Sequence, residues 1–244
     1  MRAFILIGLL TIVIQVSGQI VTDRPTQSFS PYVQPHGTVN IEAGFVSERP
    51  FSRVDVYNVT YLNALVRYGL IDWMELRVTG NYLGTRTNGQ GVNGWAPLTV
   101  GTKIHINDQT NNGFPQTGLL AQVTMKGDDQ NFGNTETVQD IRFLFQEDVH
   151  HKFVIAANIG TFWSQSTDAT GVYSVMIAFS ATDQLGIFLE PYGFFAKNTP
   201  GDQRFNAGFT YLVSDEFQLD ASLGNGLTPR SPDYFLAFGA SVRL

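Results

Sequence analysis

Residues 234–244, which end the chain, read YFLAFGASVRL. Every second position in this stretch holds an apolar or aromatic side chain: Tyr234, Leu236, Phe238, Ala240, Val242 and Leu244. The positions between them include Gly239, Ser241 and Arg243. Because successive side chains of a β-strand point to opposite faces, this period of two predicts a strand with one apolar face and one more polar face.

The same alternation recurs through most of the chain. It occupies segments of six to eleven residues. The longer ones reach the length of a tilted strand that crosses a membrane, about nine to eleven residues, whereas strands of soluble proteins most often have about five or six. The segments lie near residues 39–45, 62–68, 74–82, 98–106, 118–125, 141–146, 153–163, 173–180, 186–195, 204–211 and 217–224. With the C-terminal stretch they make about twelve strands, and bacterial outer-membrane barrels have an even number.

The connections between these segments alternate in length. Short turns lie at residues 70–73, 107–108, 148–152, 182–185 and 214–217. Longer connections, rich in Gly, Asn and Asp, lie at residues 85–95, 126–139, 164–171, 197–203 and 225–233. Short periplasmic turns that alternate with longer external loops are typical of transmembrane barrels. The predicted fold is therefore all-β, a transmembrane antiparallel β-barrel of about 12 strands.

A soluble β-sandwich is the alternative, because its strands also alternate, with the apolar faces packed between two sheets. Segment length favours the barrel, and so do the Tyr and Trp residues near segment ends, where barrels have interfacial girdles. Hydrophobic residues make up 43% of the chain but charged residues only 15%, below the roughly 25% of soluble domains. We expect a multi-pass barrel in the lipid of the outer membrane of a Gram-negative bacterium.

The first residues have the three parts of a secretory signal peptide. A basic start (Met1-Arg2) precedes an apolar run at residues 3–16 and small residues up to Gly18. The run is shorter than the roughly 20 residues of a spanning helix, which disfavours the alternative of an uncleaved anchor. We expect residues 1–18 to be a cleaved signal peptide.

The mature chain then divides into two parts. Residues 19–38, which contain Pro25, Pro31 and Pro35, predict a short N-terminal segment that stays on the periplasmic side or threads into the lumen. Residues 39–244 are expected to form the barrel.

Charged side chains on the polar faces of the strands must point into the lumen, because a charge on the lipid face costs about 2–4 kcal/mol near the midplane. Ten residues have this position: Glu42, Arg67, Glu75, Arg77, Lys103, Arg142, Glu190, Arg204, Asp220 and Arg243. They could form charge rings that select a solute, or a network of salt bridges that fills a narrow barrel. Asp23 and Arg24 could join the network if the N-terminal segment enters the lumen.

No other chemistry is indicated by the sequence. The four histidines are His36, His105, His150 and His151. A barrel enzyme would depend on His105, but no Ser and carboxylate stand at matching positions, so no catalytic residue is predicted. The chain has no cysteine, and the adjacent His150 and His151 lack further ligands, so we expect no metal and no cofactor. A net charge of −6 argues against nucleic acid as a partner.

Several short motifs follow one another in a familiar order. They are IVTDRPT at residues 20–26, VNIEAGF at 39–45, LVRYGL at 65–70, PLTVGTK at 97–103 and RFNAG at 204–208. In these motifs the chain resembles the outer-membrane family named for the meta-pathway of phenol degradation. The resemblance covers nearly the whole mature chain and implies an outer-membrane barrel that acts as a transporter.

Together these features predict a channel or transporter for small solutes, aromatic or apolar ones included. The alternative is a closed barrel with a structural role, or one that binds a partner through its external loops. The C-terminal strand, which ends at Leu244, is expected to be read by the barrel assembly machinery.

Overall fold

The structure, a computed structural model, describes residues 20–50, 55–110 and 113–244. The predicted signal peptide, residues 1–18, and Gln19 lie outside the described residues. No helix in the described part of the chain is long and apolar enough to cross a membrane. The strands that run through the described ranges are β1 (Val39–Arg49), β2 (Val56–Ile71), β3 (Met74–Thr87), β4 (Gln90–Trp95), β5 (Thr99–Asn107), β6 (Gln116–Thr124), β7 (Val138–His150), β8 (Phe153–Trp163), β9 (Thr170–Ser180), β10 (Leu185–Ala196), β11 (Asp202–Ser214), β12 (Phe217–Gly226) and β13 (Tyr234–Arg243).

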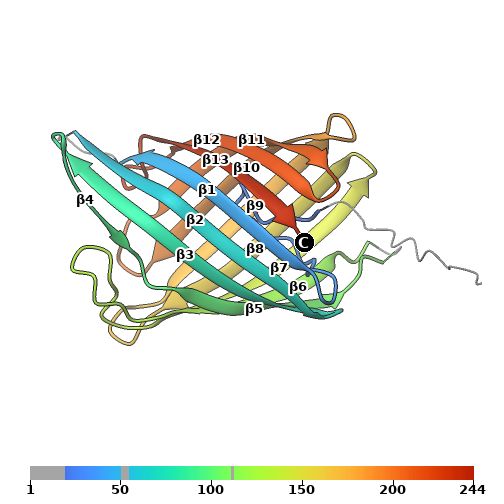
Figure 1. The fold of residues 1–244 in the computed structure, drawn as a ribbon, viewed down its shortest axis with the longest axis horizontal. Coiled ribbons are helices and arrows are strands. Elements are labelled where there is room, and N and C mark those ends of the chain that lie inside the picture. Colours follow the sequence, from blue (N-terminus) through green and yellow to red (C-terminus); the bar gives the residue numbers. More distant parts are fainter. Residues whose placement is uncertain (1–19, 51–54, 111–112) are drawn as a thin grey trace, which may run out of the picture.

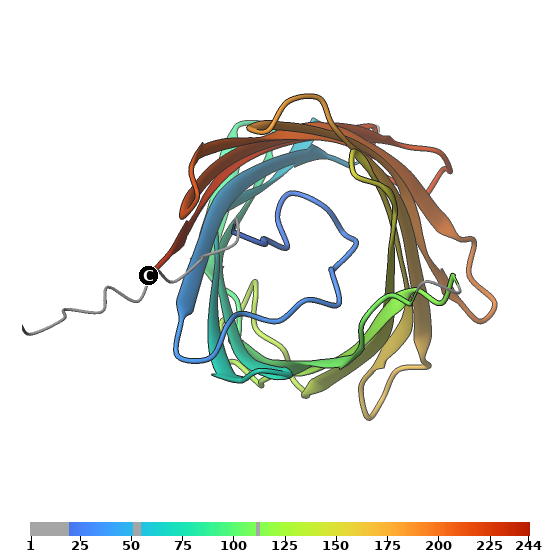
Figure 2. The same ribbon diagram turned by 90° about the vertical axis from the view of Figure 1, so that its right-hand side faces the viewer.

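All of these strands except β4 form one closed antiparallel wall (Figure 1). Each wall strand pairs with the next one along the chain, and β3 pairs with β5. The cylinder closes where β1 pairs with β13, in a register that sets Phe45 opposite Phe238. A view along the axis shows the complete ring (Figure 2). The predicted barrel of about 12 strands is confirmed.

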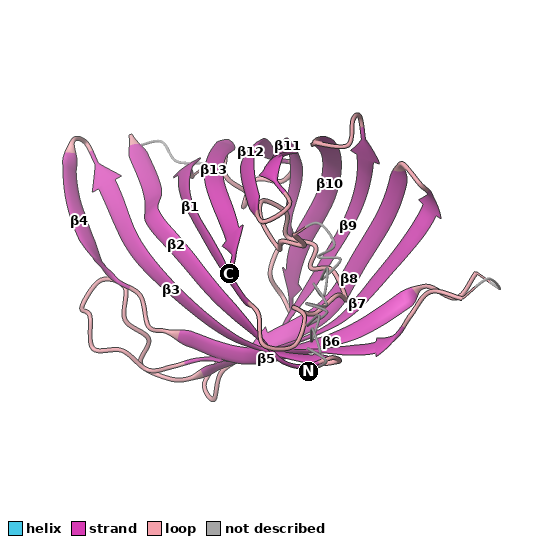
Figure 3. Cartoon of the chain, turned by 45° about the vertical axis from the view of Figure 1, so that its right-hand side comes forward, coloured by secondary structure: helices cyan, strands magenta, loops and turns pink. Residues whose placement is uncertain are grey.

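The prediction of a loop at residues 85–95 is wrong. There β3 continues to Thr87 and forms a hairpin with β4. The hairpin extends the wall at the end of the barrel where the longer connections lie, here called the long-loop end (Figure 3). Asn88 and Gly89 make the turn, with φ angles of 50° and 82°. An Asn-Gly pair with two positive φ angles is the favoured two-residue hairpin turn, so this dipeptide carried the signal for the hairpin.

The two faces of the wall differ as the alternation predicts. Apolar side chains cover the outside, where Phe143 is 53% exposed, Ile159 54% and Leu223 61%. Charged residues such as Lys103 and Glu190 are fully buried on the inside. Every backbone polar group of a closed barrel finds a partner within the wall, so this is a form in which strands can span lipid. The predicted multi-pass barrel of the outer membrane is confirmed.

The structure places the described part of the N-terminal segment, residues 20–38, inside the barrel (Figure 2). Its first residue donates a backbone hydrogen bond from Ile20 to the carbonyl of Asp215, in the turn between β11 and β12. Near its other end, Gly37 donates to the carbonyl of Gly69, close to the end of β2. Both ends of the described segment therefore lie at the end of the barrel where the short turns lie, here called the short-turn end.

Candidate functional site

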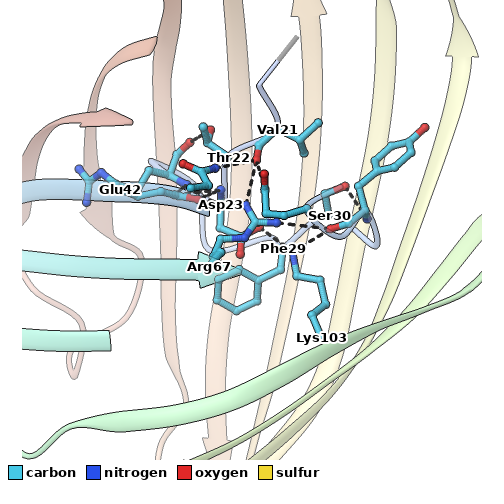
Figure 4. A network of polar contacts seen from close by, with 12 residues as sticks. Val21, Thr22, Asp23, Phe29, Ser30, Glu42, Arg67 and Lys103 are labelled. Atoms are coloured by element: carbon cyan, nitrogen blue, oxygen red, sulfur yellow. Dashed lines mark hydrogen bonds and ion pairs between the residues drawn. The ribbon is translucent and has the colours of Figure 1, made fainter. Parts of the chain in front are cut away.

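Asp23 of the N-terminal segment lies among three cations of the wall. Figure 4 labels two of them, Arg67 and Lys103. The Oδ2 atom of Asp23 is 2.5 Å from Nη1 of Arg77, and its Oδ1 atom is 2.9 Å from Nζ of Lys103. Nη1 of Arg67 is 3.7 Å from the same Oδ1 atom. All four side chains are buried, so Asp23 supplies negative charge where water cannot screen the cations.

Two carboxylates of the wall complete this charge cluster. Glu42 lies 3.0 Å from Nη1 of Arg67, and Glu75 lies 2.9 Å from Nε of the same guanidinium. The cluster of Asp23, Glu42, Glu75, Arg67, Arg77 and Lys103 thus contains three acids and three cations. A buried charge is tolerated when it is paired and hydrogen-bonded, and here the pairing requires the N-terminal segment.

The electrostatic state of Asp23 follows from these neighbours. Burial has the largest single effect and raises the pKa of its carboxyl group. The positive charges of Arg67, Lys103 and Arg77 act in the opposite direction and together outweigh burial. The pKa of Asp23 therefore lies well below its usual range, and the side chain is ionised at neutral pH.

Wall carboxylates also bind the backbone of the segment. Glu42 accepts hydrogen bonds of 3.0–3.1 Å from the N–H groups of Asp23 and Arg24. Glu190 accepts bonds of 2.6–3.0 Å from the N–H groups of Gln27 and Ser28. Segment residues that form no sheet or helix leave such N–H groups without partners, and the carboxylates satisfy them.

Further along the segment, neutral and charged wall residues continue the same pattern. Asn158 on β8 accepts from the N–H of Phe29 at 2.6 Å and donates to its carbonyl at 2.9 Å. Glu75 on β3 accepts from the N–H of Gln34 at 2.8 Å. The segment is therefore bound in turn to β1, β10, β8 and β3, and it follows the inner wall as a curved strap (Figure 2).

Arg24 ties the strap to the place where the barrel closes. Its Nη2 atom donates to Asp220 at 3.2 Å and to the carbonyl of Phe238 at 3.0 Å. The guanidinium lies over Gly44 of β1 and Gly239 of β13, which are paired, and a Cβ atom at either glycine would overlap it. The two glycines thus provide the space that this side chain occupies.

Seven of the ten predicted lumen charges contact the strap: Glu42, Arg67, Glu75, Arg77, Lys103, Glu190 and Asp220. These contacts are hydrogen bonds or ion pairs; the other three charges form their ion pairs with acids outside the strap, although Arg142 also lies over the ring of Phe29. Arg142 lies 2.8 Å from Asp140, Arg204 lies 2.9 Å from Glu48, and Arg243 lies 4.0 Å from Glu216. His105 lies near the end of β5 with Asp108 at 3.0 Å and the Tyr32 ring stacked at 6.4 Å, so the described residues around it do not form a catalytic triad.

A cavity of about 460 Å³ lies in the lumen, and residues 23–27 and Phe29 of the strap form part of its lining. On one side the wall contributes an aromatic group, defined by Tyr192 and Phe194 of β10 and Phe235 of β13. Asn81 of β3 lies on the opposite side of the twelve-strand ring from β10. The cavity therefore combines an aromatic surface with amide groups.

The family described as "Putative MetA-pathway of phenol degradation" matches residues 22–244. The chain belongs to this family. The match includes the strap from residue 22 onward as well as the whole barrel. No curated protein shows significant sequence similarity to this family member.

Solved structures share the fold of this phenol-degradation family member. An outer-membrane channel from Pseudomonas putida F1 has a TM-score of 0.70 and 13% identity, covering 90% of this chain and 100% of that one. The KdgM porin in complex with disordered oligogalacturonate has a TM-score of 0.58 and 9% identity, covering 82% of this chain and 98% of that one. The NanC porin also has a TM-score of 0.58, with 10% identity, covering 84% and 100%. At these identities the likeness concerns the fold.

Sequence reasoning about this family member missed the aromatic residues of the cavity. Tyr192 and Phe194 lie two and four positions after Glu190, so they face the lumen as Glu190 does, and Phe235 lies on the polar face of the C-terminal strand. An aromatic residue at an inward position of a barrel strand was the available signal, because lumen-facing positions are usually polar. Phe29 had no comparable signal, since the strap has no regular period.

Proposed function

We propose that the protein is an outer-membrane channel for small solutes, including aromatic or apolar ones. The observation that carries this proposal is the lumen cavity, in which an aromatic surface lies across from amide side chains. Porin lumens are usually polar and filled with water. Three aromatic side chains grouped on the inner wall depart from this pattern and suit a solute that is itself aromatic or apolar.

The aromatic group offers surfaces suited to a ring-shaped solute. Tyr192 meets Phe194 at 6.2 Å and Phe235 at 6.5 Å between ring centroids, both edge to face. Such arrangements leave ring faces and edges with the electrostatic pattern that favours further aromatic contacts. The cavity of about 460 Å³ is also roomy for this purpose, since a buried cavity of roughly 150 Å³ can already hold benzene.

The strap defines the path of a solute. Because residues 23–27 and Phe29 form part of the cavity lining and the strap lies at the short-turn end, a solute that enters from the long-loop end meets the strap next. Passage to the other end then depends on how much space the strap leaves or on its displacement. The seven charges that bind it act in this proposal as anchors, and Arg204 lines the cavity as a charge that a solute could meet.

The alternative is a closed barrel that binds a partner through its external loops. The dense bonding of the strap to Glu42, Glu75 and Glu190 favours this alternative, since a strap that never moves could seal the lumen. Conductance decides between the two functions.

Purified protein in planar bilayers should show discrete current steps, and benzyl alcohol should reduce the open-channel current by occupying the cavity. Phe194→Ala should weaken this block, because it removes part of the aromatic group. Phe195→Ala is the matched control: Phe195 follows directly on β10, is 52% exposed on the outside and does not line the cavity, so its block should equal that of the wild type. A barrel that stays silent even when Glu190→Ala loosens the strap would overturn the channel and support the closed barrel.

A further inference from the structure

Phe29 of the strap has an unusual pair of neighbours. The Cζ atom of Arg77, on β3, lies 5.5 Å from the centre of the Phe29 ring, and Cζ of Arg142, on β7, lies 5.2 Å from it. Both distances are within the roughly 6 Å at which a guanidinium is attracted to the face of an aromatic ring. One ring therefore makes two cation–π contacts with residues of two separate wall strands.

The backbone and the ring of Phe29 are held by different groups. Asn158 binds the Phe29 N–H and carbonyl at 2.6 Å and 2.9 Å, so the main chain stays in place whatever the side chain does. The ring itself lines the lumen cavity together with Arg77. A rotation of the Phe29 side chain could therefore move the ring away from the two arginines without releasing the strap.

The charges around the ring indicate what kind of ligand could replace it. Arg142 is paired with Asp140 at 2.8 Å, and Arg77 is paired with Asp23 and Glu75 at 2.5 Å and 2.8 Å. Because each guanidinium already has a carboxylate partner, the site attracts the negative face of a π system without a net attraction for an anion. The Nε atom of Arg77 is buried and has no hydrogen-bond partner within the described part of the chain, so an acceptor on the ligand could use it.

We propose that Arg77 and Arg142 form a binding site for a small neutral aromatic solute, and that Phe29 occupies this site as an internal competitor until the solute displaces its ring. The inference rests on the proposed function, because it assumes that solutes reach the lumen cavity, and it adds a location and a ligand class to it. Free solute then competes with a ring that is tethered beside the site. The apparent dissociation constant of the solute is its intrinsic dissociation constant divided by the fraction of molecules in which the ring has left the site.

The test measures equilibrium binding to the folded, detergent-solubilised barrel by calorimetry, with benzyl alcohol as the aromatic probe. Cyclohexylmethanol is the matched probe, because it has the same substituent and similar bulk but no π system. Phe29→Ala should raise the affinity for benzyl alcohol roughly five- to thirtyfold, the size expected for loss of two competing cation–π contacts. The affinity for cyclohexylmethanol should change by less than about twofold.

Two further variants keep the proposal testable if removal of the ring disturbs folding. Phe29→Leu keeps an apolar side chain of similar size but loses the π system, and it should also raise benzyl alcohol binding. Phe29→Trp provides a stronger competitor and should lower it below the wild-type value. Arg142→Gln combined with Phe29→Leu should reduce the preference for the aromatic probe relative to Phe29→Leu alone, because only Arg77 then remains to contact its ring.

Equal gains for the two probes in Phe29→Ala would overturn the inference, since they would report only the space left by the ring. Unchanged binding of both probes in Phe29→Ala and Phe29→Leu, in barrels that still shift on an unboiled gel, would overturn it as well. The assay requires no transport. A barrel that binds benzyl alcohol as expected but carries no current, even with Glu190→Ala, would support this site while refuting the proposed channel.

Discussion

The Nζ atom of Lys103, on β5, lies 2.9 Å from the Oδ1 atom of Asp23, on the strap. Lys103 is fully buried, and its other carboxylate neighbour, Glu75, is 3.7 Å away and already bound to Arg67. The wall thus contains more positive charge at this point than its own acids can satisfy at close range. The strap is part of the electrostatic structure of the barrel.

Asp23→Asn should therefore loosen the strap while the wall stays closed. Breaking a buried ion pair by removing one partner typically costs about 3–5 kcal/mol, because the remaining charge is left without compensation. The chain has no cysteine, so Ser28→Cys, at a buried strap position, provides a single reporter. We expect maleimide to label this cysteine at least about tenfold faster in the Asp23→Asn background. The control is Asp168→Asn, in the exposed loop between β8 and β9, which should leave the labelling rate unchanged.

The low pKa of Asp23 leads to a prediction about pH. A carboxyl group whose pKa is lowered by folding stabilises the folded state above its unfolded-state pKa, which is about 3.9, and loses that contribution as pH falls toward the folded-state pKa. Both labelling rates fall with pH because maleimide reacts with the thiolate, so the comparison is the ratio of the rate in Asp23→Asn to that in wild type. This ratio should be the same at pH 7 and pH 5 and should shrink only below about pH 4. A difference that already vanished at pH 5 would contradict an ionised Asp23 held by Arg67, Lys103 and Arg77.

Glu190 should act on the strap through its acceptor oxygens. It binds the N–H groups of Gln27 and Ser28 and the Nδ2 atom of Asn206. Glu190→Ala removes all of these bonds and should expose the strap, with a net cost of about 1.5–3 kcal/mol for each lost bond to the charged group. Glu190→Gln keeps one acceptor oxygen and should lie between alanine and wild type, both in labelling of Ser28→Cys and in bilayer conductance. Equal effects of the two variants would show that charge alone matters.

Gly239→Ala should displace Arg24. A Cβ atom at this position would overlap the guanidinium, which can move only by giving up its bonds to Asp220 and to the Phe238 carbonyl. We expect a folded barrel with a loosened strap, measured by the same cysteine labelling. Gly80→Ala is the matched control, because its Cβ would meet only Leu98 Cδ2, at 3.3 Å. Similar labelling in both variants would mean that Arg24 does not anchor the strap.

The outer face should respond to charge in the opposite way from the lumen. Phe143 points outward near the middle of β7, next to the inward Arg142. Phe143→Arg should lower the free energy of unfolding in lipid vesicles by about 2–4 kcal/mol, because the guanidinium would meet acyl chains. Phe143→Leu should have a smaller effect, and denaturant titration in vesicles measures both. Were arginine tolerated as well as leucine, this face would not contact lipid.

The wall could be predicted from sequence because each strand has only two environments, lipid and lumen. The alternation of Leu219, Ala221 and Leu223 with Gln218, Asp220 and Ser222 follows directly from that choice. The turn at Asn88-Gly89 shows that even a strong local signal can be overlooked inside a loop-like composition. The expectation that the ten charged side chains point inward follows from the same choice between lipid and lumen.

The partners of those charges could not be predicted. Glu42 and Glu190 bind backbone N–H groups of the strap, and a backbone group has no sequence signature. The strap has no period of two or of 3.6 residues, so nothing in its order of residues states which strand each residue will meet. Phe29 reaches Arg77 and Arg142 only because Asn158 fixes its main chain, a relation over 129 positions of sequence.

The strap precedes β1 in the chain, and β1 closes the cylinder by pairing with β13, which follows the other wall strands in the sequence. During biogenesis the strap can therefore lie against the open sheet before the seam between β1 and β13 forms, and it does not have to enter a finished pore. Arg24 lies across that seam, over Gly44 and Gly239. A barrel that closed without its strap would leave buried cations of the wall uncompensated, and its seam would lack the contacts of Arg24.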